Sequence, residues 1–140
     1  MNEKKLNSNL GESLMQPHLS YKSLLDKYIA LDNDLIRGIA HITGGGIALN
    51  LERIIPKDFT AVVNLKDYQV PVLYEVIMNK GDLSFQEMFK IFNMGIGMIL
   101  VMNKDLCDKY HNELSQLLPL GHIKKNHDDD QRVFVESAYL

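Results

Sequence analysis

Apolar positions along the chain alternate between helical spacing and short continuous runs, and this pattern predicts helices interspersed with strands. An apolar stripe at helical spacing over residues 18–32 predicts a helix, and the run IRGIAHI at 36–42 predicts a short strand. After three glycines, the segment IALNLERII predicts a short helix that Pro56 ends. The β-branched run FTAVVNL at 59–65 predicts a second strand.

The second half of the chain continues this alternation. We expect a helix at 70–80 with Gly81 as its C-cap, and a helix at 84–93 that begins with a Ser84–Glu87 capping box. The remaining expected elements are a strand at 95–103, a helix at 104–118 and two final strands, GHIKK and RVFVE, joined as a hairpin by a charged turn. Because helices and strands alternate, the helices should cover the faces of a mixed sheet.

Length and composition indicate one ordinary globular domain. The chain has 140 residues, 46% hydrophobic and 24% charged, and the expected division is a lead-in at 1–9 followed by a domain at 10–140. A net charge of −3 without a basic stripe argues against a nucleic-acid partner. The longest apolar run, 94–102, is too short to span a bilayer, so we expect no membrane partner. One cysteine, Cys107, permits no internal disulfide, which fits a cytoplasmic protein.

The segment HITGGG lies between an expected strand and an expected helix. Helix N-termini carry unpaired N–H groups, and glycines let an anion such as a phosphate approach them. The motif lacks the Lys-Ser/Thr of a Walker A loop, and Leu49 stands where a dinucleotide fingerprint has its third glycine or alanine. The residues alone leave two alternatives open: a tight turn with close packing, or an anion site.

Other residues near these glycines also have two interpretations each. His41 is either a hydrogen-bonded structural residue or a catalytic one, and Thr43 either caps the following helix or binds a ligand. In a second motif, FNMGIGM, Gly95 and Gly97 either pack closely and end a helix or admit a ligand. Asn93 either caps that helix or presents its amide to a substrate.

No set of His, Cys and carboxylate residues has metal-ligand spacing, so we expect no metal site. His122 and His127 are placed on the expected hairpin without a cysteine pair, and Asp128 to Asp130 are assigned to a solvated turn. Cys107 has no neighbouring base in the sequence and is not expected to be a nucleophile.

Taken together, the motifs resemble one enzyme family. The pattern HITGGG…N..R..P, followed by EMFK.FNMGIGM, is similar to phosphoribosylformylglycinamidine cyclo-ligase, the aminoimidazole ribonucleotide synthetase of purine biosynthesis. LGESLMQP at 10–17 resembles the entry to that enzyme's C-terminal domain, and LGHIKK with RVFVE resembles its last strands. FNMGIGM favours this family over sister enzymes such as selenophosphate synthetase, hydrogenase-maturation factors and thiamine-phosphate kinase.

The resemblance implies an α+β fold, a three-layer α/β/α domain with a mixed sheet that is partly ferredoxin-like. It also implies that the complete enzyme uses ATP and Mg²⁺ to activate the amide oxygen of formylglycinamidine ribonucleotide. A nitrogen of the same molecule then closes the imidazole ring, and ADP and phosphate are released. In the family the N-terminal half carries the nucleotide and metal signature and builds a homodimer, and this chain resembles only the C-terminal domain. We therefore expect a domain that is inactive without such a half or partner chain, or alternatively a non-catalytic homologue that retains a phosphate-binding fold.

Through the resemblance, specific residues receive roles beside a phosphorylated ribonucleotide substrate. His41 is the expected catalytic residue, and the expected substrate- and phosphate-binding residues are Thr43, Gly44, Gly45, Gly46, Asn93, Gly95 and Gly97. Asn50, Arg53 and Pro56 match the family pattern. The chain departs from it at Leu49, where a Glu is usual, at Glu52, where a Pro is usual, and at His18-Leu19, where the family has Thr-Arg/Lys.

Overall fold

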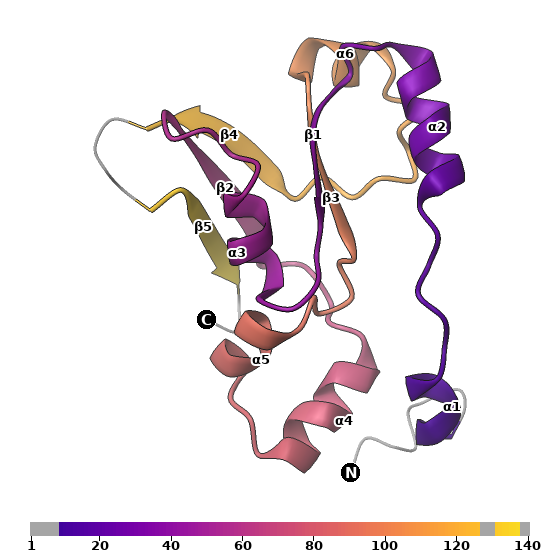
Figure 1. The fold of residues 1–140 in the computed structure, drawn as a ribbon, viewed down its shortest axis with the longest axis vertical. Coiled ribbons are helices and arrows are strands. Elements are labelled where there is room, and N and C mark those ends of the chain that lie inside the picture. Colours follow the sequence, from indigo (N-terminus) through magenta and orange to yellow (C-terminus); the bar gives the residue numbers. More distant parts are fainter. Residues whose placement is uncertain (1–8, 127–130, 138–140) are drawn as a thin grey trace.

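The computed structural model describes residues 9–126 and 131–137 (Figure 1). Helices and strands alternate and confirm the predicted α+β class. The expected lead-in at 1–9, His127 and the acidic turn at 128–130 lie outside the described residues, except for Asn9. The elements are α1 (Leu10–Leu14), α2 (Lys22–Leu31), β1 (Ile36–His41), α3 (Gly46–Glu52), β2 (Phe59–Leu65), α4 (Val72–Gly81), α5 (Phe85–Ile91), β3 (Met98–Met102), α6 (Lys104–Lys109), β4 (Gly121–Lys125) and β5 (Val133–Ser137).

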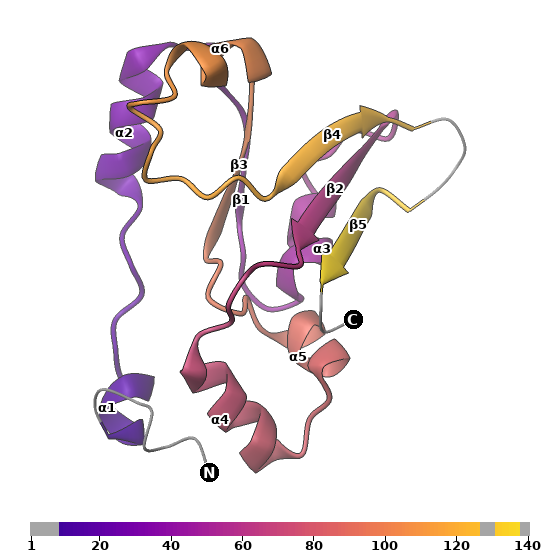
Figure 2. The same ribbon diagram turned by 180° about the vertical axis from the view of Figure 1, so that it is seen from behind.

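Strands β1 and β3 form an antiparallel pair at the centre of the molecule (Figures 1 and 2). One face of the pair contributes Ala40 and Ile99 to a large apolar core with α3, α5 and the second sheet. The other face packs Leu100 and Met102 against a smaller core centred on Tyr28 of α2. The pair is therefore covered by helices on both sides, as a layered α/β/α arrangement requires.

The second sheet is mixed and has the order β4-β2-β5. Strand β2 pairs antiparallel with β4 and parallel with β5, so the two final strands lie on opposite sides of β2 and do not form the expected hairpin. In β2 the alternate side chains Ala61, Val63 and Leu65 are buried in the large core. The period of two in this strand thus places one face of the sheet against the rest of the domain.

Several helix boundaries differ from those expected. Helix α2 begins at Lys22 and not near residue 18, and α6 ends at Lys109, after which turns replace the expected helix to 118. The left-handed C-cap of α4 is Asp82, with φ of 51°, and Gly81 is still helical. The Ser84–Glu87 capping box of α5 is confirmed, with both reciprocal hydrogen bonds present.

Residues 16–21 have no helical or strand structure and connect α1 to α2. We call this segment the strap; it runs as an extended chain along the outside of the fold (Figures 1 and 2). All its residues are exposed except Tyr21, which is half-buried and occupies the N-cap position of α2. The strap passes the same end of the β1–β3 pair at which the two glycine motifs lie.

Candidate functional site

The first glycine motif forms the loop between β1 and α3. Gly45 and Gly46 adopt left-handed φ values of 95° and 64°, which side chains with a Cβ rarely tolerate. A Cβ on Gly46 would lie 1.9 Å from the carbonyl oxygen of Phe89 in α5, so this glycine is required by packing. Gly44 is exposed and has open space where a Cβ would be. Two of the three glycines are thus explained by the chain itself, and the third leaves the backbone accessible.

Asn50, a buried residue of α3, holds this loop in shape. Its Nδ2 donates to the carbonyl oxygens of Gly46 at 2.8 Å and Gly44 at 3.2 Å, and lies 3.4 Å from that of Thr43. Arg53 in turn donates to Asn50 Oδ1 at 3.2 Å. The sequence reasoning registered these two residues only as family matches, although their spacing of three on a short helix points to such a contact.

Thr43 is exposed and does not cap α3. The N-cap of that helix is Gly45, which has no side chain to accept a hydrogen bond, so the predicted capping role of Thr43 is wrong. The Thr43 hydroxyl instead donates to Asn50 Oδ1 at the long distance of 3.5 Å. Its hydroxyl is therefore only weakly held and lies on the accessible side of the loop.

The second glycine motif forms the loop between α5 and β3, and tyrosine side chains pack against its glycines. A Cβ on Gly95 would lie 2.7 Å from the hydroxyl oxygen of Tyr68, and one on Gly97 would lie 2.1 Å from that of Tyr21. Gly95 also has a φ of 93°. The predicted close approach at these glycines therefore exists, and the approaching groups belong to the chain itself.

Asn93 organises this second loop and does not cap α5, whose C-cap is Phe92. Its Oδ1 accepts the N–H of Gly95 at 3.0 Å and the hydroxyl of Tyr74 at 2.5 Å. Burial raises the pKa of Tyr74, so its hydroxyl remains a protonated donor at neutral pH. Asn93 Oδ1 thus accepts hydrogen bonds from other groups of the protein, and the Nδ2 atom of the same side chain points toward the first loop.

Hydrogen bonds join the two glycine loops. The Ile42 N–H donates to the carbonyl of Gly97 at 2.9 Å, and Asn93 Nδ2 lies 3.5 Å from the carbonyl of Ile42. Because β1 and β3 are antiparallel, with His41 opposite Met98, the end of one strand meets the start of the other. All of the predicted site residues therefore lie at one end of the β1–β3 pair, although the two loops that carry them are about fifty positions apart in the sequence.

Two residues of the strap, His18 and Tyr21, also reach this place. The sequence analysis named His18 only as a departure from the family pattern and did not consider Tyr21. The His18 ring lies 5.1 Å from that of His41 and 5.6 Å from that of Tyr21, measured between centroids. His41 is exposed and occupies the last position of β1. The segment was expected to be helical from residue 18, which hid the contact.

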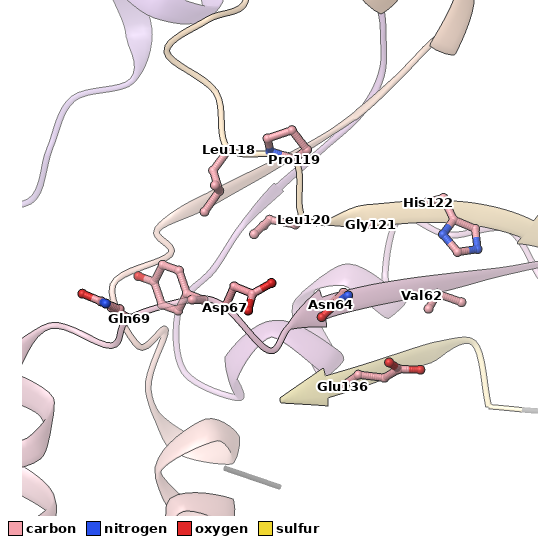
Figure 3. A pocket seen from close by; sticks show the side chains of 11 residues that line it. Val62, Asn64, Asp67, Gln69, Leu118, Pro119, Leu120, Gly121, His122 and Glu136 are labelled. Carbon is pink, nitrogen blue, oxygen red and sulfur yellow. The ribbon is translucent and has the colours of Figure 1, made fainter. Parts of the chain in front are cut away.

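A pocket of about 870 Å³ lies to one side of these loops. It is lined by residues of the three strands of the second sheet, among them Asn64, His122 and Glu136 (Figure 3). Tyr68 belongs both to this pocket and to the second glycine loop, since its hydroxyl donates to the Met94 carbonyl at 3.1 Å. None of the predicted site residues lines the pocket, so we place the candidate site at the joined loops.

Other candidate chemistry is sparse in the described part of the chain. Burial raises the pKa of the Cys107 thiol, and the nearby Asp108 charge acts in the same direction, which disfavours the reactive thiolate. Among residues 9–126 and 131–137, no three His, Cys, Asp or Glu side chains are grouped to hold a metal ion. None of the described helices has both the length and the hydropathy needed to cross a bilayer.

Comparison with known proteins identifies the family to which the chain belongs. The chain is 37% identical over 113 residues to the phosphoribosylformylglycinamidine cyclo-ligase of Pseudothermotoga lettingae, covering 80% of this chain and 32% of that protein. It is 43% identical over 105 residues to the enzyme of that name from Thermodesulfovibrio yellowstonii, covering 74% and 30%. The chain spans about a third of the length of these curated relatives. A family model described as AIR synthase related protein, C-terminal domain, matches residues 1–128, and the chain belongs to this family.

Proposed function

We propose that this chain is the substrate-side domain of a phosphoribosylformylglycinamidine cyclo-ligase, which contributes to ATP-dependent closure of the imidazole ring in purine biosynthesis. The observation that carries the proposal is the joining of the two glycine loops by the Ile42–Gly97 hydrogen bond. These loops hold the motifs that resemble the cyclo-ligase family, and curated relatives at 37% and 43% identity bear that name. The pathway would place the protein in the cytoplasm.

In this proposal the phosphate of the ribonucleotide substrate lies against the first loop. Gly44 is exposed without a neighbour within 4 Å of a Cβ position, so a ligand atom can come into contact with the backbone there. The Thr43 hydroxyl lies on the same exposed loop, and His41 is exposed at the end of β1. These groups supply hydrogen bonds that orient the substrate and stabilise developing charge. Gly95 and Gly97 act indirectly, because they give Tyr68 and Tyr21 room to support the second loop.

We assign ATP and Mg²⁺ to another part of the enzyme. Among the residues described here, no three potential metal ligands are grouped together. The curated relatives are about three times as long as the part this chain matches. The proposal therefore includes an N-terminal half, on a longer polypeptide or a partner chain, and a homodimer as the complete enzyme. The chain by itself should show no ATP hydrolysis.

The leucine at position 49 favours a second candidate function, that of a non-catalytic homologue that retains the phosphate-binding fold. This leucine is 55% exposed, and its Cδ1 lies 3.0 Å from the Cβ position of Gly45, at the rim of the first loop. The family pattern leads us to expect a glutamate there. An apolar side chain at this position removes a hydrogen-bond acceptor from the proposed substrate face.

A reconstitution experiment separates the two candidates. The chain is mixed with the N-terminal two-thirds of the Pseudothermotoga lettingae relative, and formation of aminoimidazole ribonucleotide from formylglycinamidine ribonucleotide and ATP is measured. Activity that needs both components and falls at least about tenfold with His41→Ala supports the cyclo-ligase. His111→Ala, at an exposed histidine in the turns after α6, is the matched control. No product, combined with preserved ribose 5-phosphate binding, would establish the non-catalytic homologue.

A further inference from the structure

Two histidines from distant parts of the chain meet at the edge of the joined loops. His18 comes from the strap and His41 from the end of β1, and their rings stand nearly perpendicular, at 87°, with centroids 5.1 Å apart. Both side chains are exposed to solvent. This pairing depends on how the strap passes over the β1–β3 pair, and no feature of the proposed function so far uses His18.

The contacts of His18 determine which of its nitrogens carries the proton in the neutral ring. Nδ1 lies 2.9 Å from the carbonyl oxygen of Leu19, which can only accept, so Nδ1 carries the proton in the neutral ring. Nε2 is therefore the nitrogen without a proton in the neutral ring. It lies 3.4 Å from the Cβ position of Gly97, and the Tyr21 hydroxyl lies 2.1 Å from that same point. The Nε2 side of His18 and the Tyr21 hydroxyl thus both pack against Gly97 of the second loop.

Imidazole and phenol groups lie around His18. His41 faces His18 from β1, Tyr21 faces it from the N-cap of α2, and Tyr74 of α4 is electrostatically coupled to Tyr21. A protonated imidazole among these donors attracts an anion. Two positively charged imidazoles at this separation also repel one another, and a bound dianion removes that repulsion. A metal ion would need further ligands, and the described residues offer no third one in a group with these two.

We propose that His18 and His41 form a proton-linked binding site for a phosphate-type dianion, so that the chain binds its phosphorylated ligand more tightly as the pH falls through the histidine range. His18 is then a specificity-determining residue of the site. The inference rests on the proposed function for the identity of the natural ligand, but binding itself requires only this chain.

The test uses sulfate, because sulfate keeps two negative charges between pH 5.5 and pH 8 while phosphate itself titrates there. The 140-residue chain is titrated with sodium sulfate at constant ionic strength, and the Gly97 amide and His18 ring signals are followed by NMR. One linked proton gives a Kd that is at least about tenfold lower at pH 6 than at pH 8. His18→Gln and His41→Gln should each lower this ratio, because glutamine can donate hydrogen bonds but cannot take up the proton, and the double variant should bring it below about threefold.

Control variants and a metal probe make the result decisive. His111→Gln removes an exposed histidine elsewhere and should leave the tenfold ratio unchanged. A sulfate Kd independent of pH, or an unaltered ratio in His18→Gln, overturns the proposal. Micromolar Zn²⁺ binding that disappears in His18→Gln also overturns it, by showing that the pair is a metal site. A pH-linked sulfate site in a chain that fails the reconstitution assay leaves this inference standing and removes only the cyclo-ligase proposal.

Discussion

Gly44, Gly45 and Gly46 are consecutive, yet packing requires glycine at position 46 and not at position 44. We expect Gly46→Ala to lower the free energy of unfolding by about 2 to 5 kcal/mol, since the new Cβ meets the Phe89 carbonyl oxygen and φ is 64°. Gly44→Ala should change it by less than about 1 kcal/mol, because its Cβ position is open. Urea unfolding of both variants measures the difference.

Ligand binding should separate Gly44 from Gly46 in the opposite way to stability, because the change at Gly44 affects binding and leaves the fold intact. If Gly44 is glycine to admit a ligand, Gly44→Ala weakens ribose 5-phosphate binding while the fold remains intact. Equal loss of stability in the two variants would contradict the assignment of Gly46 to packing and Gly44 to access. The comparison is matched, since both changes add one methyl group to the same loop.

For single residues, the sequence predicted where close contacts occur but not which groups make them. The spacing of Gly95 and Gly97 indicated a close approach, and the partners Tyr68 and Tyr21 come from segments that no local pattern connects to that loop. The pairing of His18 with His41 was likewise invisible, because it depends on an extended strap where an apolar stripe predicted a helix. The predicted roles of these residues in binding remain predictions.

Among the helices, α5 has a terminus whose stability should depend on pH. Hydrogen bonds from the Ser84 hydroxyl and backbone N–H lower the pKa of Glu87. A carboxylate with a lowered folded-state pKa stabilises the protein fully above its unfolded-state pKa, about 4.3 for glutamate. That contribution is lost as the pH falls through the folded-state value. Glu87→Gln should therefore destabilise the protein at pH 7 and have a much smaller effect near pH 3.

The measurement is urea unfolding of Glu87→Gln and of the parent protein at several pH values. Ser84→Ala supplies the control, because it removes the hydroxyl that donates to Glu87 Oε2 at 2.7 Å. In the Ser84→Ala background the pH-dependent effect of Glu87→Gln should shrink. An effect of the same size at pH 3 and pH 7 would show that the charge of Glu87 does not contribute through the capping box.

Elements with a strong local signal were predicted well, and those fixed by distant contacts were not. Strand β2 was predicted with its observed bounds, since β-branched residues are continuous there. After α6, isolated turns such as the one closed by the Leu114 N–H to Tyr110 carbonyl bond replace a continuous helix. Such turns accommodate the same near-helical spacing of apolar residues, which is why the sequence predicted a helix there. Just before β5, which pairs parallel with β2, Arg132 binds Glu52 and the carbonyl of Ile55 across the fold. No short-range pattern reveals such a contact.

At the scale of the whole molecule, the β1–β3 pair is shared by two apolar cores of unequal size. The large core includes β2, β5, α3 and α5, whereas the small one joins α2 to the turns after α6 through Tyr28 and Leu114. Helix α1 buries none of its residues, and the strap is exposed along most of its length. The strap is half-buried at Tyr21, where it enters α2, and its other end adjoins α1, which contributes no residue to either core.

This arrangement predicts the order in which backbone amides exchange with solvent. Amides of α1 should exchange fastest among the helices, since no side chain of that helix belongs to either apolar core, and those of β2 slowest, because β2 pairs on both sides. Sulfate at pH 6 should slow exchange at residues 18–21 in the parent protein and not in His18→Gln, because an anion held by His18 and His41 fixes the strap to the loops. Hydrogen–deuterium exchange followed by NMR measures both effects. Protection of α1 equal to that of β2 would mean that the strap is rigid at both ends, and the anion would then bind a preformed site and slow nothing.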